Sequence, residues 1–275
     1  INTIVLDKTG TNTEGAPSVQ YFEASGISEN QDAESAKRLA ILVALENHSE
    51  HPLAKAIVEY GVDKSLTLPT VENFQALIGA GLQGDIAGTR YFVGSPRLMD
   101  ELNIDFSALK DRVIQHESLG ETVVMLSNSE EVLAMITMAD PIKSSSKEAI
   151  ANLKALGIEV IMLTGDNART AAKIGADVGL TEKEIVAELK PEDKASVVQE
   201  LQAKGRIVAM VGDGINDAPA LAQADAGIAM GTGTDIAMES ADVTIMNGDL
   251  LNLSKMIRLS GKTMRKIKQN LFWAF

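Results

Sequence analysis

Short apolar runs alternate with helical patterns from residue 140 onward. The runs that predict buried strands lie at 158–163, 185–189, 207–212, 226–230 and 243–246. The segments between them space their apolar residues as helices do, over 145–156, 167–178, 191–203, 216–223 and 234–240. Because strands and helices alternate, this part predicts a parallel sheet with right-handed crossovers. Its strands are apolar throughout, which is typical of a sheet covered on both faces.

The first 137 residues add one such strand and then a different pattern. Residues 2–6 predict a buried strand. Residues 32–60 predict two helices with a break at 47–52, because Pro52 suits the first turn of a helix. The elements expected in residues 70–137 are strands over 86–93 and 122–126 and a helix over 106–119. The pattern indicates an α/β domain, doubly wound around a parallel sheet, that is interrupted by an α+β insertion.

Acidic residues follow three of the predicted parallel strands. They are Asp7, Asp166 and Asp213, and Asp217 comes shortly after the last of them. In parallel sheets, ligands bind beyond the carboxyl ends of the strands. We therefore expect the acids to gather at one edge. Asp7 is a candidate nucleophile, because a carboxylate can attack a phosphoryl group and form an aspartyl phosphate.

Other residues near these strand ends could support such a reaction. Mg²⁺ prefers hard oxygen ligands, and Asp7 with Asp213 could hold it. Lys194 could supply a fixed positive charge, and Thr164 could bind phosphoryl oxygens. Asp217 could orient Lys194 or the water shell of the metal. A solvated helix lysine is the alternative interpretation of Lys194.

Composition narrows the class of protein. Of 275 residues, 45% are apolar, so a sizeable core can form. The net charge of −13 argues against a nucleic-acid partner, because phosphate backbones bind basic surfaces. The chain has no cysteine, which excludes disulfides and thiolate metal sites. No apolar run reaches the roughly 18 residues of a membrane helix.

Several other sequence patterns can be explained without a dinucleotide-binding or metal-binding site. Gly79, Gly81 and Gly84 match a dinucleotide-binding pattern, but a hairpin and not a helix is expected after them. His48 and His51 have helical spacing, yet Pro52 breaks that spacing, so a zinc site is not favoured. His116 is expected at the surface. The methionines, such as Met162, Met210 and Met230, lie in strand patterns and are expected in the core rather than as copper ligands.

Taken together, the motifs resemble those of one enzyme family. The chain resembles heavy-metal-transporting P-type ATPases of the haloacid-dehalogenase-like fold through DKTGT (7–11), TGD (164–166), GDGINDAPAL (212–221) and SEHPLA (49–54). The stretches ADPIKSSS, GTGTDIAMESAD and QNLFWAF are most similar to copper-exporting members. The resemblance spans essentially the whole chain. It implies an ATP-driven pump that passes through an aspartyl phosphate.

The resemblance also implies roles for individual residues. ATP would phosphorylate Asp7, and Mg²⁺ would bind Asp7, Asp213 and the backbone carbonyl of Thr9. The other catalytic positions implied are Lys8, Thr164, Gly165, Asp166, Lys194, Asn216 and Asp217. Thr164 and Lys194 would contact the phosphate, and Asp166 would lie near the nucleotide or hinge. The adenine pocket would be lined by Glu46, His51, Gly79, Gly81 and Gly94.

The resemblance divides the chain into domains. A phosphorylation domain is expected from residues 1–20 and 138–262, with a nucleotide-binding domain over 21–137. Residues 263–275 would begin a membrane helix that is cut short. Closure about a hinge near 16–22 and 136–142 would carry the γ-phosphate to the nucleophile. The partners implied are ATP and the transmembrane and actuator domains of a pump at the cytoplasmic face of a membrane.

Three alternatives stay open at the level of the sequence. One is a zinc- or cadmium-transporting member of the same family. Another is a phosphatase of the same fold; many of these carry an acid two residues after the nucleophile, where this chain has Thr9, which is a poor general acid. The third is a silent nucleotide-binding module. The chain also departs from the family at Asn12, where leucine is usual, and a buried amide there needs hydrogen-bond partners.

Overall fold

The computed structural model describes most of the chain, in two compact units. It describes residues 1–26, 32–62, 64, 66–77, 80–213, 215–231 and 235–274. The first unit contains Ile1–Glu14, Ile142–Gly165 and Ile174–Phe275. The second contains Gly15–Pro141 together with Asp166–Lys173. The chain therefore passes into the second unit directly after the stretch that follows the first strand.

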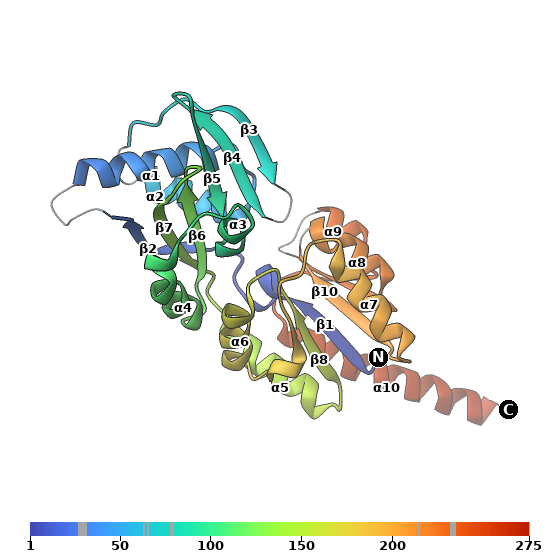
Figure 1. The fold of residues 1–275 in the computed structure, drawn as a ribbon. Coiled ribbons are helices and arrows are strands. Elements are labelled where there is room, and N and C mark those ends of the chain that lie inside the picture. The colour runs from blue at the N-terminus through green and yellow to red at the C-terminus, as the bar shows by residue number, and fades with distance from the viewer. Residues whose placement is uncertain are drawn as a thin grey trace. The chain divides into compact units, whose positions relative to one another are not determined.

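The first unit contains a six-stranded parallel sheet in the order β12-β11-β10-β1-β8-β9 (Figure 1). Its strands are β1 (Thr3–Asp7), β8 (Glu159–Leu163), β9 (Ile185–Val186), β10 (Val208–Gly212), β11 (Ala226–Met230) and β12 (Val243–Ile245). The predicted parallel sheet is confirmed. β9 is shorter than the predicted 185–189, because Glu188 adopts a φ of 59°, which no extended strand can continue through.

Helices cover both faces of this sheet. They are α5 (Ser146–Ala155), α7 (Asp193–Ala203), α8 (Ala218–Gln223), α9 (Asp235–Glu239) and α10 (Leu251–Ala274), with short turns at Glu182–Glu184 and Ile215–Asp217. The end of α6 (Ala168–Asp177) from Ile174 onward also belongs to this unit, whereas Ala168–Lys173 group with the second unit. Ile4 and Leu6 pack with residues of α5 and α10, whereas Val5 packs with residues of α7 and α8. Successive strand residues point to opposite faces, so a strand apolar at every position is buried on both sides.

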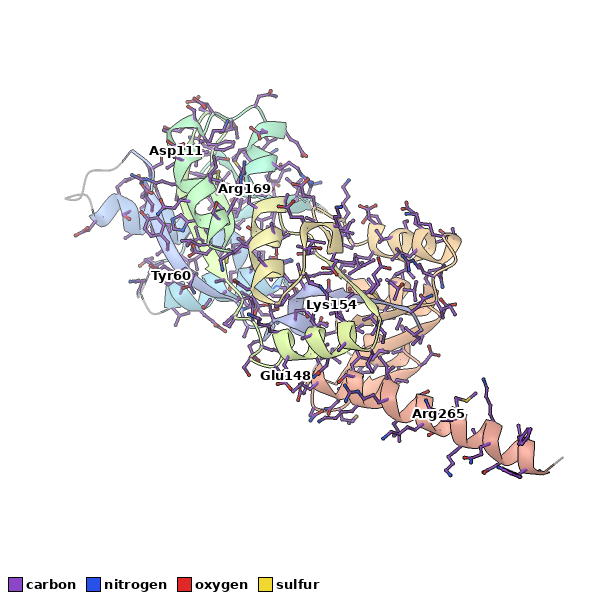
Figure 2. The ribbon with its side chains drawn as sticks, turned by 90° about the horizontal axis from the view of Figure 1, so that it is seen from below. Tyr60, Asp111, Glu148, Lys154, Arg169 and Arg265 are labelled. Atoms are coloured by element: carbon purple, nitrogen blue, oxygen red, sulfur yellow. The ribbon has the colours of Figure 1, made fainter. Side chains whose placement is uncertain are left out.

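Helix α10 is covered only at its beginning. Leu253 and Ser254 are buried, while residues 258–274 are exposed, including Leu271, Phe272 and Trp273. Arg265, labelled in Figure 2, lies on this exposed part. Among the described residues, no helix is both long enough and apolar enough to cross a membrane.

The second unit contains an antiparallel sheet in the order β2-β7-β6-β5-β4-β3. Its strands are β2 (Ser18–Ala24), β3 (Glu72–Leu77), β4 (Gly81–Ile86), β5 (Thr89–Gly94), β6 (Thr122–Ser127) and β7 (Val132–Ala139). The helices are α1 (Asp32–Glu46), α2 (Pro52–Val62), α3 (Pro96–Glu101) and α4 (Lys110–Ser118), with a short turn at Ser107–Leu109. Val124 and Leu126 pack against α1 and α2, and Val123 and Met125 pack against α3 and α4.

One expectation from the sequence needs correction here, and another stays a prediction. The hinge expected near 16–22 and 136–142 lies close to the two places where the chain passes between the units, Glu14–Gly15 and Pro141–Ile142, and its first part overlaps β2 from Ser18 onward. β2 was missed because its apolar residues do not alternate regularly. His116 is half-buried and not at the surface, since its ring stacks on Tyr21 and its Nδ1 lies 2.7 Å from Glu121. The methionines follow the prediction: Met162, Met210 and Met230 are fully buried.

Candidate active site

The carboxyl ends of β1 and β10 place two acids side by side in the first unit. Asp7 is the last residue of β1, and Asp213 directly follows β10. The register pairs Leu6 with Val211, so the two strands end at the same level. Carboxylate oxygens of Asp7, Asp213 and Asp217 all lie within 4.8 Å of one another. The edge therefore gathers three carboxylates, as the strand-end argument predicted for Asp7 and Asp213.

Lys194 of α7 lies between two of these carboxylates. Its Nζ donates to Asp7 Oδ1 at 2.7 Å and to Asp217 Oδ1 at 2.7 Å. The second oxygen of Asp217 accepts a hydrogen bond from the backbone N–H of Asp213 at 3.2 Å. Charge-assisted hydrogen bonds of this kind fix the side chains in place. Lys194 is 9% exposed and is thus not the solvated helix lysine of the alternative interpretation.

Burial and crowding of like charges control ionisation at this edge. Burial, together with repulsion from Asp217, outweighs the attraction of Lys194 and raises the pKa of Asp7 to about 7. Burial likewise raises the pKa of Asp213 to about 6, although the charge of Lys143 opposes the shift. For Lys194, burial favours the neutral form, but the carboxylates of Asp7 and Asp217 more than offset it and raise the pKa of Lys194. More positive charge would stabilise the ionised cluster.

A magnesium ion fits the chemistry of this cluster. Its donors are carboxylate oxygens, which are the ligands Mg²⁺ prefers. Burial is the largest cause of the raised pKa values of Asp7 and Asp213, and repulsion from Asp217 adds to it despite the lysines nearby. A divalent cation would compensate the charge of the ionised carboxylates. Asp7 and Asp213 could hold it together with the carbonyl of Thr9.

The stretch Lys8–Asn12 after the nucleophile forms an irregular turn with non-helical backbone at Thr9 and Gly10. Gly10 has a φ of 68°, and a Cβ placed there would lie 1.5 Å from Asp213 Oδ2. Only glycine lets the backbone approach that carboxylate so closely. The carbonyl of buried Lys8 accepts the backbone N–H and the hydroxyl of Thr13, both at 3.2 Å. These contacts hold the turn beside Asp7 and Asp213.

The other predicted catalytic residues are distributed unevenly around the cluster. Thr164 is buried and hydrogen-bonded through its backbone to Val186 and Leu189, and Gly165 follows it. Asn216 is exposed. Asp166 lies outside the group of carboxylates described above: its Oδ1 accepts the Thr122 hydroxyl at 3.2 Å, and it groups with the second unit. The expectation that Asp166 shares the edge with Asp7 is therefore corrected. A side chain's direction after a strand end is not encoded in the spacing.

Asn12 is fully buried next to Asp7. Its Nδ2 donates to the backbone carbonyl of Asp7 at 3.2 Å. Its Oδ1 is one of the buried side-chain atoms that have no hydrogen-bond partner in the described part of the chain. Leaving a buried acceptor unsatisfied costs about 1–3 kcal/mol. Asn12 therefore stabilises the fold through one weak hydrogen bond and destabilises it through the cost of burying an unpaired oxygen.

We expect Asn12→Leu to raise the free energy of unfolding by about 1–2 kcal/mol and the melting temperature by about 3–6 °C, because the unsatisfied oxygen is removed and apolar packing is gained. Thermal unfolding at neutral pH measures the change. Asn12→Asp is the matched control, since it has the same shape but buries a charge, and it should lower the melting temperature. A lower melting temperature for Asn12→Leu would show instead that the amide is needed to hold the Asp7 carbonyl.

The second unit has its own candidate site around Glu46, the last residue of α1. Glu46 is 7% exposed, and burial raises its pKa to about 7. Among the described residues its carboxylate has no hydrogen-bond partner. It lines a hollow of about 270 Å³ with Asn47, Ser49, Lys55, Val58 and Glu59. A buried, unpartnered carboxyl beside an open hollow suits a ligand that can hydrogen-bond to it.

The other residues predicted to line the adenine pocket differ in their exposure and in their contacts. His51 is exposed, and its Nδ1 accepts the backbone N–H of Leu53 at 3.2 Å. Gly81 and Gly94 pair across β4 and β5, where a Cβ on Gly81 would lie 2.1 Å from the Val93 carbonyl oxygen. This explains glycine at 81 by close backbone approach. Gly79 lies outside the described residues. The ring of His48 lies tilted against that of Phe74, with 5.3 Å between the ring centroids.

Lys143, in the first unit, contacts the turn that follows Asp7, and the spacing of the motifs did not predict this contact. Its Nζ donates to the carbonyl of Gly10 in the turn after the nucleophile and, at 3.2 Å, to the carbonyl of Gly248. The sequence signal was its place in ADPIKSSS, two residues after a proline that ends the insertion. Nothing in that stretch indicates a contact with a loop more than 130 positions earlier.

The chain is similar to known hydrolases and P-type ATPases. A family model described as "Hydrolase: haloacid dehalogenase-like hydrolase" matches residues 1–225. The chain is 49% identical over its full length to "Probable copper-importing P-type ATPase A" of Enterococcus hirae, of which it covers 36%. It is 46% identical, again over its full length, to "Copper-exporting P-type ATPase" of Staphylococcus haemolyticus, of which it covers 33%. The chain thus spans about a third of the length of these relatives.

A solved structure covers nearly the same extent as this chain. It is titled "Conformational changes in the catalytic domain of the CPx-ATPase CopB-B upon nucleotide binding". The TM-score is 0.73 and the identity 30%, and the match covers 94% of this chain and 88% of the other. The likeness supports the α/β fold with its inserted unit.

Proposed function

Because this chain belongs to the haloacid dehalogenase-like hydrolase family, we propose that it is the catalytic portion of a metal-transporting P-type ATPase. Asp7 takes the γ-phosphate of ATP and becomes an aspartyl phosphate. The observation that carries the proposal is the cluster at the ends of β1 and β10, where Lys194 lies 2.7 Å from Asp7 and from Asp217. This arrangement offers a nucleophile, a fixed cation and oxygen ligands for Mg²⁺ within one small space.

The chemistry follows from the contacts of Asp7. A carboxylate oxygen attacks the γ-phosphorus, the bond from that phosphorus to the β,γ-bridging oxygen breaks, and ADP leaves with the electron pair. Oδ1 already accepts from Lys194, which leaves the other oxygen for attack. The nucleophile must be ionised, and Lys194 favours that form. Bound Mg²⁺, held by Asp7, Asp213 and Thr9, would supply charge compensation for the phosphoryl group.

Both the protonation of a leaving group and the later hydrolysis of the phosphoenzyme depend on a general acid–base beside the nucleophile. The position two residues after Asp7 is Thr9, whose hydroxyl is too weak an acid to protonate a leaving group efficiently. Rapid hydrolysis of small phosphate esters is therefore disfavoured. A phosphoenzyme that persists suits a pump, where it must last through a conformational cycle.

The nucleotide would bind in the second unit, with its adenine in the hollow beside Glu46. The exocyclic amine of adenine donates hydrogen bonds, and the buried carboxylate of Glu46 is an acceptor without a described partner. His51, Gly81 and Gly94 are the further candidates for this pocket, together with Gly79. The phosphates would then have to reach Asp7, so binding and chemistry belong to different units.

We expect Glu46→Gln to weaken ATP binding about 5- to 30-fold and to stabilise the folded protein at pH 8 by about 1–3 kcal/mol. The folded protein keeps the Glu46 proton up to about pH 7, whereas the unfolded chain releases it near 4.5. The folded state therefore binds more protons between these values, and wild-type stability falls as the pH rises through them. Isothermal titration and chemical unfolding at pH 4.5 and pH 8 measure the two effects.

Glu59→Gln is the control for this variant, because Glu59 lines the same hollow but is exposed. It should leave the stability unchanged at both pH values. Unchanged ATP affinity in Glu46→Gln would remove Glu46 from the nucleotide site. An equal gain in stability at both pH values would contradict its titration near pH 7.

The phosphoenzyme itself is the test of the proposed function. The protein is incubated with Mg²⁺ and γ-labelled ATP, quenched in acid, and assayed for bound label. Label that survives acid and is lost to hydroxylamine is expected, because acyl phosphates have this stability. Omitting Mg²⁺ should prevent labelling. ATP binding without any label would favour a silent nucleotide-binding module.

The full-length protein would use this phosphorylation to move copper across a membrane. The names of the curated relatives support copper as the transported ion. The transmembrane and actuator domains of such a pump would be the partners of this chain. The catalytic portion would then lie at the cytoplasmic face. Metal-stimulated ATP hydrolysis by the full-length protein, compared between copper and zinc, tests the choice of ion.

A further inference from the structure

We propose that Lys143 is a positioning residue for phosphoryl transfer, which ties the turn after the nucleophile to the segment that precedes α10. This inference rests on the proposed function. Asp7 and Asp213 carry the chemistry, but neither fixes the backbone of residues 8–12. Lys143 contacts that backbone without being one of the reacting groups.

The first observation is that Lys143 and its neighbours contact the turn at several points. The Lys143 backbone N–H donates to the carbonyl of Asn12 at 3.0 Å, and its Nζ donates to the carbonyl of Gly10. The hydroxyl of Ser146 donates to the same Asn12 carbonyl at 2.8 Å. Ile142 forms a bridge to Thr13. The segment 142–146 thus determines where residues 10–13 lie.

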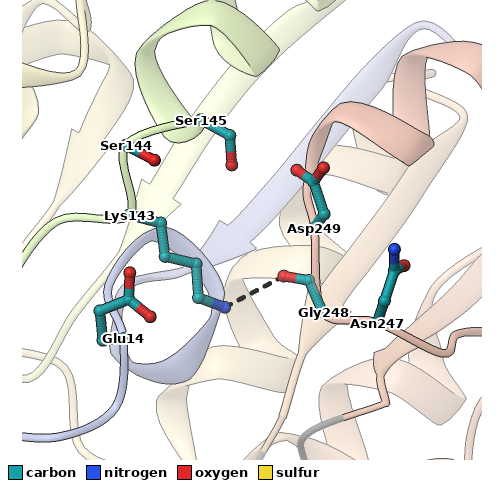
Figure 3. Close-up of a pocket in the computed structure, with 7 residues that line it drawn as sticks. All are labelled: Glu14, Lys143, Ser144, Ser145, Asn247, Gly248 and Asp249. Atoms are coloured by element: carbon teal, nitrogen blue, oxygen red, sulfur yellow. Dashed lines mark hydrogen bonds between the residues drawn. The ribbon is translucent and has the colours of Figure 1, made fainter.

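The second observation concerns the other end of the Lys143 side chain. Its Nζ also donates to the carbonyl of Gly248 at 3.2 Å, as Figure 3 shows. Gly248 lies between β12 and α10, so one ammonium joins two segments that are far apart in sequence. Both acceptors are neutral carbonyls, and Glu14 and Asp249 line the same pocket of about 220 Å³. These two carboxylates favour an ammonium over a neutral side chain at that place.

The third observation is how little freedom the turn has. At Gly10 the backbone lies so close to Asp213 that a Cβ would overlap its carboxylate. A shift of the Gly10 carbonyl would therefore displace the peptide between Thr9 and Gly10 and the predicted metal ligands beside it. Misplacing reacting groups by about 1 Å can cost roughly 100-fold in rate. Lys143 is placed to prevent such a shift, and this effect should appear in the phosphorylation step and not in ATP affinity.

The test compares Lys143→Met with Lys147→Met, which removes an exposed lysine from the beginning of α5. We expect Lys143→Met to slow phosphoenzyme formation about 10- to 100-fold while the ATP dissociation constant stays within about two-fold of wild type. Amide hydrogen exchange over residues 8–13, measured without Mg²⁺ or ATP, should become faster in Lys143→Met alone. The control should match wild type in all three measurements.

The outcomes separate this inference from the proposed function. Wild-type protein that takes no label from ATP would refute the proposed function. Labelled wild type with a Lys143→Met variant that labels equally fast would overturn the role of Lys143, as would unchanged exchange over residues 8–13. If Lys143→Met does not fold, Lys143→Gln is measured instead, because its uncharged side chain is too short to join the carbonyls of Gly10 and Gly248. A wild-type rate in that variant would also overturn the inference.

Discussion

Asp7→Asn is expected to abolish labelling by γ-labelled ATP, with a fall of more than about 1,000-fold, because an amide is not a nucleophile toward phosphorus. The same substitution should stabilise the protein in the absence of Mg²⁺ at pH 8, by about 1–3 kcal/mol. Burial and Asp217 raise the pKa of Asp7 to about 7, so the ionised carboxylate is costly to the fold above that pH. Acid-quenched labelling and thermal unfolding measure the two effects.

The opposite signs of these two effects make the prediction specific. A structural acid would lose stability on substitution, whereas an acid retained for chemistry should lose activity and gain stability. ATP binding should persist, since the proposed nucleotide site lies in the second unit. Asp100→Asn, which neutralises an exposed acid, is the control and should change neither quantity. Label that persists in Asp7→Asn would assign the nucleophile to another residue.

Lys194→Met is expected to have the largest effect on stability. Removing one partner from a buried ion pair costs about 3–5 kcal/mol, because the remaining charges are left uncompensated. Asp7 and Asp217 would then face each other and Asp213 without the ammonium that lies 2.7 Å from the first two. We expect the melting temperature at pH 8 to fall by about 10 °C. Labelling by ATP should fall at least 100-fold.

The dependence on pH and metal distinguishes this cause from lost packing. The charge of Lys194 lowers the pKa of Asp7 and of Asp213, so without it these two carboxyl groups keep their protons to higher pH and the loss of stability should shrink as the pH is lowered toward 5. Added Mg²⁺ should restore part of the stability at pH 8. Lys204→Met, at the exposed end of α7, is the control and should leave the melting temperature unchanged. A deficit that is equal at pH 5 and pH 8 would show that Lys194 contributes mainly through its apolar stem.

Much of the fold could be predicted from the sequence because parallel strands buried on both faces have a distinct signature. IVL within β1 and VAMVG in β10 are uninterrupted apolar runs, and both strands are buried throughout. β2 was missed because its sequence contains no such uninterrupted apolar run. Its sequence SVQYFEA is exposed or half-buried at every position and does not alternate cleanly, so it becomes a strand only by pairing with β7.

The candidate site was predictable to the extent that it depends on strand ends. Asp7 and Asp213 each follow an apolar run, and topology alone brings such positions to one edge. The same argument placed Asp166 there incorrectly, because its carboxylate binds Thr122 instead. Spacing gives the position of a Cα along an element, whereas the direction of a side chain after the strand end depends on neighbours that are distant in sequence.

The sequence by itself determined the α/β class and the insertion and indicated the candidate nucleophile and the acids around it, since these follow from periodicity and from the order of motifs. Only the tertiary structure decided that Lys194 lies between Asp7 and Asp217, that Asn12 has an unsatisfied oxygen and that Lys143 joins Gly10 to Gly248. Each of these contacts involves atoms brought together by chain folding or by burial. Their energies depend on distance and desolvation, which no linear pattern encodes.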